Sequence, residues 1–319
     1  MMFRSEVTHR AWGDGVEGMR VQECVLSDEV ITVDSAEAAL WDAIVVPEEI
    51  KDRLRNQTVL SLLVRPELPF AVTALHGLCT LYGPPGTGKT TLARGLPAQV
   101  ARYVGGGAVR RIEINPHGLM SAEHGQSQQR VSELLGEYVP GLASDGVPTV
   151  VILDEVESMA VARSAASLAA NPADVHRATD AVLTALDLNA AEHPHLFFVA
   201  TSNFTTALDE AFLSRSDAAI LVPLPGPEAL GRILASTLLM LADKYPALGE
   251  LARSAAMERI AEAAHGLDGR RTRKVVFEAL AQRLDTVLDP GSLTEDDLAA
   301  AVCNAVAETS EPEVSRAAY

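Results

Sequence analysis

One apolar segment, Leu78–Tyr82, runs without a break into a glycine-rich loop, GPPGTGKT, and a helical pattern follows the loop. This order constrains the fold more than any other feature, because the pattern GxxxxGK[ST] between a strand and a helix is typical of a loop that wraps around phosphate groups. The glycines let backbone N–H groups turn inward, and the helix N-terminus adds partial positive charge. The residues expected to form this phosphate loop are Gly83, Pro84, Pro85, Gly86, Thr87, Gly88, Lys89, Thr90 and Thr91.

Two side chains of the phosphate loop carry further chemistry. Lys89 is expected to reach the β and γ phosphates of a nucleoside triphosphate, and Thr90 is expected to supply a hydroxyl ligand to Mg²⁺. A glycine loop that serves only a turn is the alternative, and the flanking strand and helix disfavour it.

Around this loop, from about residue 77 to 222, short apolar runs alternate with helical patterns. This alternation is typical of βαβ units and a parallel sheet. Most of the runs are almost continuously apolar, as expected where helices cover both faces of a sheet, whereas Val109–Ile114 alternates and is predicted to be an edge strand. The sequence therefore predicts an α/β fold with five parallel strands, at Leu78–Tyr82, Val109–Ile114, Thr149–Leu153, Leu196–Ala200 and Ala218–Val222.

The sequence pattern changes on both sides of this region. The first 45 residues are acidic and interrupted by glycines, with one strand expected at Val30–Val33. After Pro227 the strand signals stop, and apolar stripes at helical spacing predict an all-helical domain. We therefore expect a small N-terminal module (1–45), a large α/β domain (46–224), a helical lid (225–307) and a flexible tail (308–319).

A pair of carboxylates, Asp154 and Glu155, directly follows the strand Thr149–Leu153. Parallel sheets bind ligands at the carboxyl ends of their strands, so the pair is expected beside the phosphates. In this interpretation Asp154 binds the metal, and Glu155 polarises the attacking water. An N-cap pair on the next helix is the alternative, and the phosphate loop disfavours it.

Three further residues are candidates because of where they lie relative to the strands and the lid. Asn203 follows the strand Leu196–Ala200 and can hold the attacking water or the γ-phosphate, or else serve only a turn. Arg215 precedes the last strand and Arg270 begins a lid helix. Taken singly, both arginines would be interpreted as solvated surface charges.

These features follow one another in the order found in the AAA+ ATPases. Within that class, the chain resembles the HORMA-domain-remodelling family known as pachytene checkpoint protein two, over roughly residues 40 to 290. The segments that carry the resemblance are RIEINPHGL (Arg111–Leu119), VILDEVESM (Val151–Met159), NPADVHRATDAVLTALD (Asn171–Asp187), ATSNFTTALDEAF (Ala200–Phe212) and HGLDGRRTRKV (His265–Val275).

The resemblance implies a homohexameric ring that hydrolyses ATP with Mg²⁺ and converts a closed HORMA-domain protein to an open one. It implies that Arg215 is an arginine finger, which acts on the nucleotide of the neighbouring subunit. It also implies that Arg270 is a second sensor, through which the lid detects the γ-phosphate. Bacterial relatives accompany HORMA proteins and nucleotide-second-messenger synthases in anti-phage operons. The implied partner is therefore a HORMA-domain protein, alone or bound to a nucleotidyltransferase, whose complex this chain disassembles as a negative regulator.

Composition restricts the partners further. Lys plus Arg is 26 against Asp plus Glu 43, a net charge of −17, so the chain as a whole repels nucleic acid. This charge disfavours a nucleic-acid-linked AAA+ loader, and the presence of Glu155 and Asn203 disfavours a nucleotide-gated binding module without turnover. Three separated cysteines indicate neither a disulfide framework nor a zinc site, and no apolar stretch reaches the roughly 18 residues of a membrane span. We therefore expect a cytoplasmic protein with no nucleic-acid or membrane partner.

Overall fold

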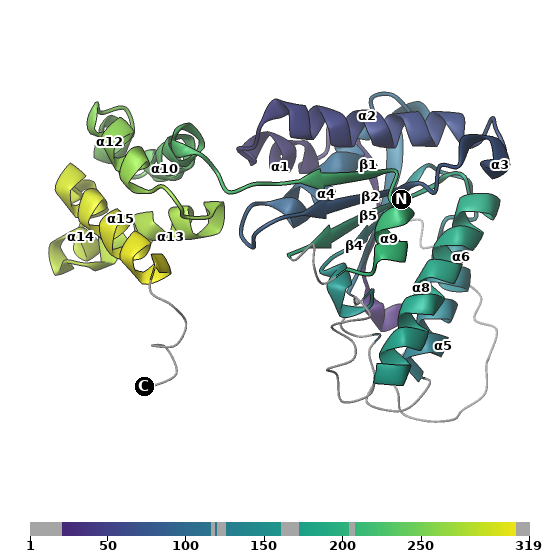
Figure 1. The fold of residues 1–319 in the computed structure, drawn as a ribbon. Helices are drawn as coiled ribbons and strands as arrows, with labels where there is room; N and C mark the ends of the chain where they lie inside the picture. The colour runs from purple at the N-terminus through teal and green to yellow at the C-terminus, as the bar shows by residue number, and fades with distance from the viewer. Residues whose placement is uncertain (1–20, 116–118, 120–125, 161–171, 204–207, 311–319) are drawn as a thin grey trace.

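A computed structural model describes residues 21–115, 119, 126–160, 172–203 and 208–310. An α/β part with a central sheet is joined through an extended segment to a group of helices near the C-terminus (Figure 1). The predicted fold class, an α/β fold followed by a helical region, is confirmed.

The described sheet has six strands in the order β1-β3-β4-β5-β2-β6. Neighbouring strands from β3 to β6 in this order are all parallel, whereas β1 runs antiparallel to β3. The predicted five parallel strands are thus confirmed, and a sixth strand extends the sheet at one edge. The strands are β1 (Val25–Thr32), β2 (Leu78–Tyr82), β3 (Ala108–Ile114), β4 (Thr149–Leu153), β5 (Leu196–Ser202) and β6 (Ala218–Leu221).

The prediction that Val109–Ile114 forms an edge strand is wrong, because β1 pairs with its outer side. The alternating pattern has a different cause. Arg111 of β3 donates a hydrogen bond of 2.7 Å to Glu29 of β1, and its guanidinium lies 3.5 Å from Glu37. A polar residue that suggested an exposed edge is therefore paired with carboxylates from neighbouring elements, one of them on β1, a strand that comes from the segment 1–45.

Helices cover both faces of the sheet, because strand side chains alternate between two apolar layers. In β4, Val150 and Ile152 belong to one layer, and Val151 and Leu153 belong to the other. The first layer packs against α1 (Glu37–Ala43), α2 (Glu48–Val64) and α4 (Lys89–Val100). The second layer packs against α5 (Gln126–Glu133), a π-helical turn (Leu134–Tyr138), α6 (Val139–Leu142), α8 (Pro172–Glu192) and α9 (Glu210–Ser214). A short helix, α3 (Phe70–Thr73), precedes β2.

The C-terminal helices, which we call the lid, enclose an aliphatic core of their own that includes Leu234, Ile260 and Val275. The lid comprises α10 (Pro227–Ala242), α11 (Pro246–Leu251), α12 (Ala256–Ala263), α13 (Gly269–Ala281), α14 (Leu284–Leu288) and α15 (Glu295–Ser310). Among the described helices, none combines the length and apolar character needed to cross a membrane. The domain boundaries at residues 45, 224 and 307 stay predictions.

Candidate active site

The phosphate loop connects β2 to α4, and its glycines adopt backbone conformations that other residues avoid. The φ angles of Gly83, Gly86 and Gly88 are +146°, +76° and +95°. A Cβ at Gly83 would approach the carbonyl oxygen of Val222 to 2.2 Å, and one at Gly86 would approach a carboxylate oxygen of Asp268 to 2.1 Å. The loop is therefore closely bordered by the chain that leaves β6 and by the start of α13, and only glycine fits these contacts.

Lys89 is the first residue of α4 and is only 6% exposed. Its Nζ donates hydrogen bonds to the carbonyl oxygens of Gly83 (2.9 Å) and Pro84 (2.8 Å). Burial lowers the pKa of the Lys89 ammonium from its ordinary value, an effect that the nearby carboxylates of Glu157 and Asp154 oppose. Because a buried cation is stabilised by an anion, this loop fits a phosphate group.

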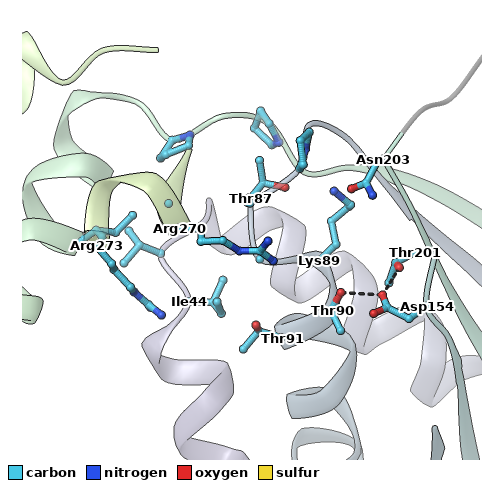
Figure 2. A pocket seen from close by; sticks show the side chains of 18 of the residues that line it. Ile44, Thr87, Lys89, Thr90, Thr91, Asp154, Thr201, Asn203, Arg270 and Arg273 are labelled. Carbon is cyan, nitrogen blue, oxygen red and sulfur yellow. Dashed lines mark hydrogen bonds between the residues drawn. The ribbon is translucent and has the colours of Figure 1, made fainter. Parts of the chain in front are cut away.

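The Asp154 carboxylate joins the phosphate loop to the sheet (Figure 2). Its Oδ1 accepts a hydrogen bond of 2.7 Å from the Thr90 hydroxyl of α4 and another from the Thr201 hydroxyl of β5. Magnesium prefers oxygen ligands and is held in phosphate sites by one or two protein side chains together with the phosphates. The predicted pair of Thr90 and Asp154 therefore fits a magnesium ion beside bound phosphate.

Two of the predicted catalytic residues, Glu155 and Asn203, lie within contact of each other where β4 and β5 end. Glu155 has a φ of +52°, and its N–H donates to the Thr201 hydroxyl (3.0 Å). The Asn203 amide nitrogen lies 3.4 Å from Oε1 of Glu155, and the Asn203 N–H donates to Glu157 (3.0 Å). The structure thus brings an exposed carboxylate and an amide together beside the predicted metal ligands Thr90 and Asp154.

These groups line a cavity of about 330 Å³ that also includes lid residues. Besides the phosphate loop, Asp154, Glu155 and Asn203, the cavity has an apolar side at Ile44 and Val45. From the lid, Arg270 extends toward the phosphate loop, and Arg273 enters from the same helix (Figure 2). A cavity that combines a glycine loop, cationic side chains and an aliphatic patch beside the loop fits a nucleoside triphosphate.

The lid touches the phosphate loop directly at the start of α13. The N–H of Arg270 donates to the carbonyl oxygen of Gly86 at 3.3 Å. Asp268 caps α13, because its Oδ1 accepts a hydrogen bond of 2.9 Å from the N–H of Arg271. The position of Arg270 is therefore fixed by main-chain contact with the loop as well as by the helix that carries it.

Apart from Gly83, Pro84 and Arg215, every residue predicted from the sequence lines this cavity. Gly83 and Pro84 do not line the cavity, but their carbonyl oxygens accept the hydrogen bonds from Lys89. The lining residues that were not predicted from the sequence are Ile44, Val45, Thr201, Pro223, Pro225, Ile233, Gly269, Arg273 and Lys274. Two of them could have been predicted. Thr201 lies at the carboxyl end of the strand that Asn203 follows, and Arg273 follows Arg270 by one helical turn. Ile44 and Val45 precede α2 and are indistinguishable from core residues in sequence.

The remaining predicted residue, Arg215, lies outside the cavity at the end of α9. Its Nε and Nη2 donate to the two carboxylate oxygens of Asp187 on α8, both at 2.7 Å, and Nη1 donates to the carbonyl oxygen of Ala211 (2.9 Å). The hydrogen bonds from Arg215 hold the pKa of the Asp187 carboxyl below its usual range. The structure therefore does not bring Arg215 together with the other predicted residues of the same chain.

Lys89→Ala is expected to weaken ATP binding by about 10- to 100-fold, because a charge-assisted contact to phosphate is worth about 1.5–3 kcal/mol. Titration of the purified variant with ATP and Mg²⁺ by calorimetry measures this loss. The matched control is Lys244→Ala, a lid lysine that stacks on Tyr245 away from the cavity. Equal affinity of wild type and Lys89→Ala would contradict the assignment of the phosphate loop.

The fold and the cavity together define an ATPase of the AAA class. The family described as "ATPase family associated with various cellular activities (AAA)" matches residues 79–224, the segment from β2 to the exit of β6. Two solved structures share the fold. One is "Structure of E. coli MS115-1 HORMA:CdnC:Trip13 complex", with TM-score 0.71 and 19% identity over 90% of this chain and 97% of that chain. The other is "Structure of C. elegans PCH-2", with TM-score 0.69 and 23% identity over 89% and 76% of the two chains.

Relatives of higher sequence identity narrow the class. CD-NTase-associated protein 6 of Pseudomonas aeruginosa is 46% identical over 269 residues, which cover 84% of this chain and 88% of that protein. The Pachytene checkpoint protein 2 homolog of Danio rerio is 30% identical over 282 residues, 80% of this chain but only 66% of the zebrafish protein. The chain belongs to the family of AAA ATPases that contains these two proteins, and the resemblance predicted from the sequence is confirmed.

Proposed function

We propose that this chain hydrolyses ATP and uses the energy to remodel a HORMA-domain protein. The observation that carries the catalytic part is the pairing of Glu155 with Asn203, beside the hydrogen-bonded pair of Thr90 and Asp154. A module that only bound nucleotide would need the phosphate loop but neither a carboxylate nor an amide beside the metal ligands.

Each group of the site has a role in this proposal. Lys89 and the N–H groups of the phosphate loop bind the phosphates, and Thr90 and Asp154 hold Mg²⁺, which supplies positive charge to the phosphate oxygens when bound. Glu155 accepts a proton from the attacking water, and Asn203 orients that water against the γ-phosphate. Arg270 of the lid adds a further positive charge at the cavity, through which the lid detects the γ-phosphate.

Hydrolysis in this proposal requires assembly into a homohexamer. Transition-state charge on the γ-phosphate is stabilised by an arginine in this type of chemistry, and an arginine supplied by a neighbour is one arrangement. The position of Arg215, outside the cavity of its own chain, supports that arrangement. The site of one subunit is then complete only when a second subunit presents its Arg215.

The proposed partner follows from the family and from the names of its members. A relative is called CD-NTase-associated protein 6, and a structure with the same fold is a HORMA:CdnC:Trip13 complex. We therefore propose that the substrate is a HORMA-domain protein, alone or bound to a nucleotidyltransferase, and that its disassembly in the cytoplasm switches an anti-phage signal off. The net charge of −17 supports a protein partner over a nucleic-acid one.

The experiment that tests this function uses the chain with a purified HORMA protein and its nucleotidyltransferase. Adding the chain and ATP is expected to separate the complex on size-exclusion chromatography, whereas a non-hydrolysable ATP analogue is expected to leave it intact. A parallel arm adds duplex DNA in place of the complex. ATP turnover that DNA stimulates, together with a HORMA complex that stays intact, would favour a nucleic-acid-linked loader instead.

A further inference from the structure

Within the part of the chain that the structure describes, the guanidinium of Arg215 uses three of its hydrogen-bond donors. An arginine carries five N–H donors in a fixed fork. Three of them are used within the chain, two by the Asp187 carboxylate and one by the Ala211 carbonyl oxygen. Among the residues that the structure describes, the remaining two donors have no acceptor. Since the side chain is 22% exposed, these donors are available to a group outside the chain.

The Asp187 carboxylate is itself held from a second element. Nε2 of His76 lies 3.4 Å from Oδ1 of Asp187, and the His76 ring stacks edge-on against Phe70 with centroids 4.9 Å apart. The N–H of His76 donates to Asp217 (2.8 Å), two residues after Arg215. Asp187 thus contacts His76, which lies in the segment directly before β2. The phosphate loop follows β2 in the chain.

We infer that Asp187 is a positioning residue for Arg215, which orients the two open donors toward the γ-phosphate of the neighbouring subunit. This inference rests on the proposed function, in which Arg215 acts between subunits. The pair with Asp187 fixes the plane of the guanidinium and leaves one N–H on Nη1 and one on Nη2 that a phosphate oxygen can accept from. Asp187 is 46% exposed, and a bidentate ion pair near the surface can also stabilise the fold, so the tests below read kcat together with ring assembly rather than stability alone.

Asp187→Asn tests the inference, because it keeps the size of the side chain and removes its charge. We expect kcat for ATP to fall by about 10- to 100-fold, as misplacement of a charged group does, with KM and ring assembly unchanged. The control is Glu192→Gln on the same helix, an exposed residue that makes the same charge change and is expected to leave kcat as in wild type. A wild-type or higher kcat for Asp187→Asn would overturn the inference.

Mixed rings test whether Asp187→Asn lowers turnover only when it is placed in the chain that supplies Arg215. Arg215→Ala chains retain Glu155, and Glu155→Gln chains retain Arg215, so mixing the two inactive proteins is expected to restore turnover wherever an intact arginine faces an intact carboxylate. Adding Asp187→Asn to the Glu155→Gln chain, which donates the arginine, is expected to reduce the restored rate by about 10- to 100-fold. Adding it to the Arg215→Ala chain is expected to leave that rate unchanged.

The outcomes distinguish a failure of the proposed role of Arg215 between subunits from a failure of the inference about Asp187. Without restored turnover in the simple mixture, Arg215 does not act between subunits, and this part of the proposed function falls together with the inference. If turnover is restored but Asp187→Asn has the same effect on either chain, or none, the inference alone is overturned.

Discussion

Glu155→Gln is expected to stop ATP turnover while the protein still binds ATP. Glutamine keeps the shape of the side chain and its contact with Asn203 but cannot accept a proton, and general-base catalysis is worth about 100- to 10,000-fold in rate. The phosphate loop and the pair of Thr90 and Asp154 are untouched by the change, so affinity for the nucleotide should remain. A ring that holds ATP without hydrolysing it should also retain a bound HORMA protein.

The measurement is steady-state release of phosphate by Glu155→Gln, combined with calorimetric titration of the same sample with ATP. The matched control is Glu133→Gln, an exposed residue of α5 outside the cavity. Normal phosphate release by Glu155→Gln would show that another group activates the water. Loss of ATP binding would show that Glu155 holds the nucleotide rather than reacting with it.

Arg215→Ala is expected to lower the ATP turnover of assembled rings by about 1,000-fold or more, the effect of an arginine finger in this chemistry. Binding of ATP by single chains should be unchanged, because Arg215 does not line the cavity of its own chain. The fold should also persist, because within the described residues the side chain is hydrogen-bonded only to Asp187 and Ala211, near the surface.

Turnover and ATP affinity of Arg215→Ala are compared with those of Arg259→Ala, an exposed arginine of α12. Reduced turnover with unchanged affinity is the expected result. If Arg215→Ala instead loses ATP affinity in the same proportion as turnover, the arginine contacts nucleotide in the ground state. Wild-type turnover would remove Arg215 from the reaction altogether.

The parallel strands and the phosphate loop were predictable because their signals are local. Strand β2 was predicted with the bounds observed, and a buried strand that enters a glycine loop leaves few other folds. The edge position of Val109–Ile114 was predicted wrongly for a reason that is not local. Its alternation indicated solvent, but the polar side chain of Arg111 faces carboxylates of β1 and α1, which lie about 80 residues earlier in the chain.

The residues of the candidate site were likewise predictable only where their sequence signals are local. Lys89, Thr90 and Asp154 follow from spacing and strand ends, and the structure places them together. Ile44 and Val45 line the cavity only because α1 packs on α4, where Trp41 lies so close to Gly95 that a Cβ would approach the Trp41 nitrogen to 2.9 Å. That packing depends on a long-range contact that no local pattern indicates.

We propose that ATP is hydrolysed at sites that two subunits share. The most direct test is the rate of ATP turnover per chain, measured as the protein concentration is raised through the range in which rings assemble, with a HORMA protein present. We expect a specific activity that rises steeply with assembly and then levels off. A specific activity that is the same for isolated chains and for rings, or no turnover at any concentration, would contradict it.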